Sequence, residues 1–108
     1  MSSGLAATTD YVPKMVSTVI TSYNKGIYLA EAIESALCQD YRPQEVIVVD
    51  DGSTDNTRIV CERFGSRITY IYQENKGQQH AKNRGVLESK GEFIAFLDGD
   101  DRWRPGKL

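Results

Sequence analysis

Residues 93–100 form an apolar run that ends in two acids around a glycine: Phe93-Ile94-Ala95-Phe96-Leu97-Asp98-Gly99-Asp100. An apolar run of this length, bounded by turn residues, predicts a buried strand. Residues 46–51 repeat the pattern, because Val46-Ile47-Val48-Val49 precedes the acid pair Asp50-Asp51. The two stretches therefore predict two strands that deliver carboxylates to one edge of a sheet.

The rest of the chain alternates between strand-like and helix-like segments. β-Branched and apolar residues predict further strands at residues 16–21 and 68–72, and the strand before Asp50 is predicted to span residues 45–49. Helical spacing of apolar residues, helix-forming composition and breaker residues predict helices at residues 25–38, 55–65 and 78–89. We expect Asn24 to cap the first helix, and the second helix to bury Ile59, Val60 and Phe64.

This alternation predicts an α/β fold. Strands joined through helices lie parallel, because β-α-β units are right-handed. We therefore expect an open, mostly parallel sheet with helices on both faces, of the Rossmann-like kind. Ligands bind such sheets beyond the carboxyl ends of the strands. Residues 1–14 are predicted to be an irregular leader, and residues 15–108 a single domain.

Composition argues against several classes of protein. A net charge of -2, from 13 basic and 15 acidic residues, leaves no electrostatic footprint for nucleic acid. Cys38 and Cys61 lack metal-ligand spacing, so reduced thiols are expected rather than a disulfide framework. The first ten residues do not resemble a signal peptide, and no stretch predicts a transmembrane segment. We expect a cytoplasmic protein, and a location at the cytoplasmic face of a membrane is compatible with this expectation.

Acidic residues gather at the predicted carboxyl edge of the sheet. Asp51 and Asp98–Asp101 fall there, together with Tyr23. Carboxylates this close repel one another unless a cation offsets their charge. Hard oxygen ligands without clustered His or Cys favour Mn²⁺ or Mg²⁺ over zinc. Because the carboxylates are few, we expect substrate phosphate and water to complete the metal's ligand shell. The predicted chemistry is therefore phosphate-linked.

Four segments together resemble the nucleotide-binding half of a family 2 glycosyltransferase of the GT-A fold. They are residues 19–24, residues 48–55, residues 75–77 with 81–85, and residues 91–101. The resemblance covers Met15 to Leu108. It implies transfer of a sugar from a nucleotide diphosphate donor, with inversion at the anomeric carbon and a divalent metal.

The resemblance also implies a role for individual residues. Asp100 would hold the metal that bridges the donor diphosphate, and Asp98 the ribose or the metal shell. Asp51 would read the base; a carboxylate only accepts hydrogen bonds, so it selects a base with a ring N–H. A UDP-sugar fits best, ahead of dTDP and GDP sugars. Thr21 and Tyr23 would flank the base, and Lys82 would lie near the diphosphate.

The same resemblance places the general base of the reaction downstream of Leu108. This chain is thus expected to be a truncated donor-binding half, inactive alone, whose acceptor is a saccharide, a lipid-linked molecule or a protein. The turn at residues 52–54 is expected to be held by Asp50 through backbone N–H groups. Lys82 and Arg84 are equally consistent with exposed charges on a helix face, whereas Arg102 and Arg104 are expected to be solvated charges and His80 to have a surface or packing role.

Two other classes share some of these features. A receiver domain also carries an acid pair after an apolar strand and a later phosphoacceptor acid, for which Asp98 would serve. Receivers, however, begin at the acid-pair strand, whereas here a strand and a helix precede it. A nucleotidyltransferase would need a Gly-rich basic loop after the first strand, which residues 22–26 do not provide. A donor-binding fragment without transfer activity is a further alternative.

Overall fold

A computed structural model describes residues 11–108 and confirms the predicted α/β fold. Within these residues the strands are β1 (Val12–Ser22), β2 (Gln44–Asp51), β3 (Thr69–Gln73) and β4 (Gly91–Asp98). They form one sheet in the order β3-β2-β1-β4, and every neighbouring pair is parallel. All the carboxyl ends therefore meet at one edge.

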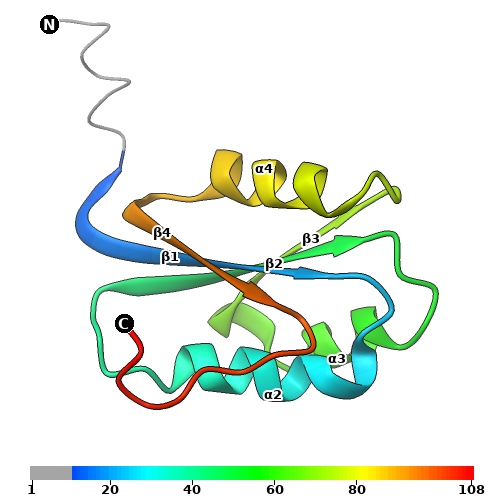
Figure 1. Cartoon of the computed structure of the whole chain (residues 1–108), viewed down its shortest axis with the longest axis horizontal. Coiled ribbons are helices and arrows are strands. Elements are labelled where there is room, and N and C mark those ends of the chain that lie inside the picture. Colours follow the sequence, from blue (N-terminus) through cyan, green and yellow to red (C-terminus); the bar gives the residue numbers. More distant parts are fainter. Residues whose placement is uncertain (1–10) are drawn as a thin grey trace, which may run out of the picture.

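Helices cover both faces of the sheet, as expected. Helices α2 (Gly26–Leu37) and α3 (Thr57–Glu62) lie on one face, and α4 (Gln78–Glu88) lies on the other (Figure 1). A short 3₁₀ turn, η1 (Gly65–Arg67), follows α3. No helix in the described part of the chain is both long and apolar enough to cross a bilayer.

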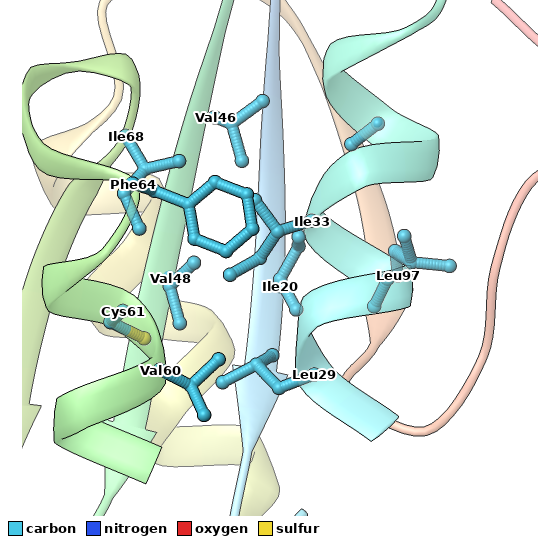
Figure 2. Packing of buried hydrophobic residues seen from close by; sticks show 12 residues of the cluster. Ile20, Leu29, Ile33, Val46, Val48, Val60, Cys61, Phe64, Ile68 and Leu97 are labelled. Carbon is cyan, nitrogen blue, oxygen red and sulfur yellow. The ribbon is translucent and has the colours of Figure 1, made fainter. Parts of the chain in front are cut away.

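Each face of the sheet has its own core. On the α2 and α3 side, Ile33 and Phe64 pack with Ile20 and Val48 of the central strands (Figure 2). On the other side, Ala81 of α4 packs on a smaller cluster that includes Val19. Helix α4 lies so close that a Cβ at its Gly85 would come within 2.3 Å of a Val19 methyl carbon. The central strands are buried on both faces, which explains their unbroken apolar runs.

Strand β4 departs from the prediction of a buried strand. It pairs only with β1 and forms an edge of the sheet. Phe93 and Phe96 are 52% and 46% exposed, whereas Leu97 is buried. An edge strand has a neighbour on one side only, and α4 packs mainly over β1 and β2. An apolar run therefore predicted the strand correctly but not its burial.

Two further predictions are corrected. Strand β1 begins at Val12, inside the predicted leader, because Val12 pairs with Gly91 at the start of β4. The leader's first ten residues lie outside the described part of the chain. Ile59 is 55% exposed, so its predicted burial was wrong, while Val60 and Phe64 are buried as expected. Helix α3 spans only Thr57–Glu62, so few of its positions face the sheet.

Candidate functional site

A pocket of about 590 Å³ lies at the carboxyl edge of the sheet. Five residues that the sequence singled out line it: Thr21, Tyr23, Asp51, Asp98 and Asp100. They come from the ends of β1, β2 and β4. The other lining residues are Ser22, Lys25, Asn75, Gly77, Gln78, Ala81 and Gly99. The predicted gathering of acids at this edge is thus what the fold produces.

Asn24 joins the loop after β1 to the loop after β2. Its backbone is left-handed, with φ of 52°, and its side-chain Oδ1 accepts hydrogen bonds from the backbone N–H groups of Thr54 and Asp55. The Asn24 N–H donates to Ser53 Oγ, and the Gly26 N–H donates to Asp55 Oδ2. Asn24 was predicted to be the cap of α2, but Lys25 holds that position without a side-chain bond. The prediction failed because the Asn24 side chain binds a distant loop instead.

Replacing Asn24 tests whether this inter-loop contact shapes the pocket. Asn24→Ala removes the acceptor and places a residue that disfavours positive φ there, so we expect a stability loss of about 1–2 kcal/mol and roughly ten-fold weaker binding of the nucleotide that the sequence resemblance implies. Asn24→Asp keeps an acceptor for both backbone donors and should behave nearly like the parent. Calorimetric titration with UDP and urea unfolding measure the two effects. Equal behaviour of the Ala and Asp variants would contradict a role for the acceptor.

Asp51 is buried and accepts hydrogen bonds from the end of β3 and from the loop before α4. Its Oδ1 accepts hydrogen bonds from Gln73 Nε2, at 2.9 Å, and from the Lys76 N–H, at 2.8 Å. Its Oδ2 accepts one from the Gly77 N–H at 2.9 Å. A carboxylate offers about four acceptor positions, so about one remains for a ligand. Sequence reasoning identified Asp51 but not these partners, which lie 22 to 26 residues away along the chain.

Asp50 has a structural role, as predicted for the turn that follows β2. It is 1% exposed, and its Oδ1 accepts a hydrogen bond from the Ser53 N–H. Its Oδ2 accepts one from the Tyr70 hydroxyl at 2.6 Å. Burial, and then the hydrogen bond to Asp50 and its charge, raise the pKa of Tyr70. Burial and the charge of Asp50 raise the pKa of the Cys61 thiol to about 12.

The Tyr70 pKa predicts a loss of stability at alkaline pH. A tyrosine in the unfolded chain ionises near pH ~10, whereas the folded protein keeps Tyr70 protonated to higher pH. Above about pH 10 the unfolded state therefore binds fewer protons than the folded state, and stability falls as pH rises. Tyr70→Phe should cost about 1–2 kcal/mol at pH 7 and progressively less above pH ~10. Urea unfolding between pH 7 and about 11.5 measures this difference, with the exposed Tyr28→Phe as control. A Tyr70→Phe penalty that is independent of pH would contradict it.

The Asp98-Gly99-Asp100 segment closes the pocket beside β1. The Gly99 N–H donates to the Thr21 carbonyl, and a Cβ at Gly99 would come within 2.9 Å of Ser22 Oγ. A glycine is thus needed for the close approach of the two strand ends. Asp98 Oδ1 accepts a hydrogen bond from Gln78 Nε2 at 2.8 Å. Asp100 Oδ2 lies 3.1 Å from Lys25 Nζ.

Several basic residues considered from the sequence lie elsewhere. Lys82 is outside the pocket lining, with its Nζ 5.5 Å from the centre of the Phe96 ring. Arg84 pairs with Glu88 on α4, and Arg102 pairs with Glu31 of α2. His80 is exposed, in agreement with its predicted surface role. The basic residue that does line the pocket is Lys25, which sequence reasoning missed because its partner lies 75 positions away.

The pocket acids are suited to a metal ion whose ligands come partly from the protein and partly from a bound molecule. Between residues 11 and 108, no three acidic, His or Cys side chains gather as metal ligands. Asp100 is about half exposed and already faces a positive group, Lys25. Hard carboxylate oxygens fit Mn²⁺ or Mg²⁺ when phosphate and water supply the other ligands. Asp100, with the free oxygen of Asp98, would therefore supply only part of such an ion's ligand shell, and a bound ligand and water would supply the rest.

Known proteins share this sequence and fold. Residues 17–108 match the model of glycosyl transferase family 2. The glycosyltransferase GlyG of Streptococcus pneumoniae is 45% identical over 92 residues, which cover 82% of this chain and 31% of GlyG. Residues 1–349 of S. aureus TarS, solved with UDP-GlcNAc, match with TM-score 0.72 and 32% identity, over 82% of this chain and 27% of the solved TarS chain. The mannosyltransferase PcManGT of Pyrobaculum calidifontis, solved with GDP-Man and Mn²⁺, matches with TM-score 0.70 and 29% identity, over 82% and 28%.

A parallel α/β sheet with a pocket at its carboxyl edge defines a class of α/β proteins that bind ligands at that edge. Within that class, this chain belongs to glycosyl transferase family 2. The predicted resemblance and the GT-A fold are confirmed. The chain spans 31% of GlyG and between 14% and 41% of the length of the other curated relatives compared with it.

Proposed function

We propose that this chain binds the nucleotide-sugar donor of a metal-dependent, inverting glycosyltransferase, with a UDP-sugar as the preferred donor. The observation that carries the proposal is the pocket itself, where Thr21, Tyr23, Asp51, Asp98 and Asp100 line one cavity. Their three strands are separate in sequence but end at the same edge of the sheet. The complexes of TarS with UDP-GlcNAc and of PcManGT with GDP-Man and Mn²⁺ support this kind of ligand.

Asp51 supports the choice of base. The acceptor position left on its carboxylate suits a ring N–H donor, which uracil, thymine and guanine present and cytosine and adenine do not. The loop amides of Lys76 and Gly77 hold the carboxylate in place, so base selection would not require its reorientation. Tyr23 is 47% exposed at the pocket, and its ring is available to stack on the base.

Asp98 and Asp100 support the proposed binding of the donor's diphosphate end. Asp100 would hold the divalent cation, while Asp98 would bind the ribose or the outer metal shell. A cation bound there would supply positive charge to the diphosphate leaving group. Lys82 would contribute only if it left the Phe96 ring.

Inversion requires attack on the anomeric carbon from the face opposite the diphosphate, and a general base for the acceptor hydroxyl. We place that base outside this chain, so these 108 residues would bind donor without efficient transfer. A saccharide, a lipid-linked molecule or a protein would be the acceptor of the whole enzyme.

Calorimetric titration with UDP, dTDP, GDP, ADP and CDP, each with and without Mn²⁺, tests the proposal. We expect UDP to bind most tightly, ADP and CDP least, and Mn²⁺ to strengthen UDP binding by roughly ten-fold or more. Binding that ignored both base and metal would refute the donor-site assignment. Phosphorylation of Asp98 by acetyl phosphate would favour the receiver alternative instead.

A further inference from the structure

The pocket contains an ion pair that competes with the proposed metal. Lys25 Nζ lies 3.1 Å from Asp100 Oδ2, and both side chains are somewhat less than half exposed. Lys25 immediately precedes α2, whereas Asp100 follows β4. The fold therefore brings a cation from one end of the chain to the acid that would hold a metal at the other.

The hydrogen bonds that the other pocket acids accept come from neutral donors. Asp51 accepts hydrogen bonds from two backbone N–H groups and one amide, and Asp98 accepts one from the Gln78 amide. Lys25 is the one basic side chain among the described residues that line this pocket. Asp100 is thus the pocket acid whose charge is offset by a full positive charge, and that charge is Lys25.

We propose that Lys25 is an exchangeable counter-ion: it neutralises Asp100 in the ligand-free pocket and would pair with the donor's phosphates if Asp100 held a divalent cation. The inference rests on the proposed donor-binding function and adds a residue and an order of events to it. Every positive charge then has a negative partner both before and after ligand binding.

The geometry makes such an exchange inexpensive. A partly exposed Lys–Asp pair is weak, because solvent screens it and two flexible side chains must be held together. The lysine ammonium sits on a flexible four-carbon stem, so it can reach a new partner while its backbone stays in place. The Lys25 carbonyl remains bonded to the Tyr28 and Leu29 N–H groups at the start of α2, and those bonds do not depend on the side chain.

The exchange predicts effects of opposite sign for the two ligands. Without the charge of Lys25, a divalent cation no longer has to displace an ammonium group from Asp100, so the metal alone should bind more tightly. The donor's phosphates lose a charge-assisted partner, so UDP should bind more weakly even when metal saturates the protein. Because coupling between two ligands is reciprocal, part of the mutual strengthening of Mn²⁺ and UDP should disappear.

Lys25→Met tests this, with Lys90→Met as the matched control. Lys90 is exposed and precedes β4, at the end of the sheet away from the pocket. Electron paramagnetic resonance of free Mn²⁺ measures metal binding without nucleotide, and calorimetry measures UDP binding at saturating Mn²⁺. For Lys25→Met we expect Mn²⁺ alone to bind roughly two- to five-fold tighter and UDP to bind roughly ten-fold weaker. Lys90→Met should change neither by more than about 1.5-fold, and Lys25→Arg should retain most UDP affinity.

Three results would overturn the exchange. Weaker UDP binding with unchanged Mn²⁺ binding would make Lys25 a phosphate ligand that does not compete with metal. Tighter Mn²⁺ binding with unchanged UDP binding would leave Lys25 as a competitor that never reaches the phosphates. No change in either, in a parent protein that binds UDP with Mn²⁺, would remove Lys25 from the site altogether. Failure of the parent protein itself to bind UDP would instead refute the donor-binding function.

Discussion

Asp51→Ala is expected to release the loop before α4 from the pocket and to abolish measurable UDP binding. The substitution leaves two backbone N–H groups and the Gln73 amide without their acceptor at a position that is 4% exposed. These donors are only part-buried, so losing each hydrogen bond to the carboxylate should cost about 1 kcal/mol, and we expect a total loss of about 3 kcal/mol. In a domain of this size that corresponds to a fall in Tm of more than about 10 °C.

Urea unfolding and calorimetry with UDP measure these two losses. Asp40→Ala, the same change at an exposed residue with no side-chain bond among the described residues, is the control and should shift stability by less than about 0.5 kcal/mol. Asp51→Asn separates binding from folding, because its amide keeps one oxygen for two of the donors but offers an N–H to the base. A folded Asp51→Asn protein that still prefers UDP over CDP would contradict base reading by this residue.

Asp100→Asn is expected to eliminate the metal dependence of UDP binding while the chain stays folded. The side chain is partly exposed and its neighbours do not need it for packing, so stability should change by less than about 1 kcal/mol. A neutral amide is a poor ligand for Mn²⁺ compared with a carboxylate. We therefore expect UDP affinity at saturating Mn²⁺ to fall roughly 10- to 100-fold, toward the value measured in EDTA.

The neighbouring acid provides the control for Asp100. Asp101 lies outside the pocket lining, and its Oδ1 accepts a hydrogen bond from the Arg102 N–H. Asp101→Asn should retain the full effect of Mn²⁺. Because Asp100→Asn also releases Lys25 from its ion pair, UDP binding in EDTA should not weaken in that variant. Loss of metal dependence in Asp101→Asn alone would mean that the metal ligand had been assigned to the wrong residue.

Local sequence patterns predicted the elements and the acids at their ends. Unbroken apolar runs at residues 46–49 and 93–97 correctly indicated strands, since such runs report local backbone preference. Their positions before Asp51 and Asp98 then placed these acids at the carboxyl edge, because parallel strands share that edge. Burial was predicted less well: Phe96 of β4 and Ile59 of α3 are exposed. Burial depends on which neighbours cover a residue, and hydrophobicity along the chain does not specify them.

The amino-acid sequence by itself determined the α/β alternation, the parallel sheet and the acid-bearing strand ends of this family 2 glycosyltransferase chain. The tertiary structure alone decided which partners these strand ends meet: Asn24 binds the loop at Thr54, Asp51 binds the loop at Gly77, and Lys25 pairs with Asp100. These partners lie 26 to 75 positions apart, so they depend on strand order and loop approach, which no local pattern encodes. A pocket made of such contacts becomes visible only when the strand ends are brought together.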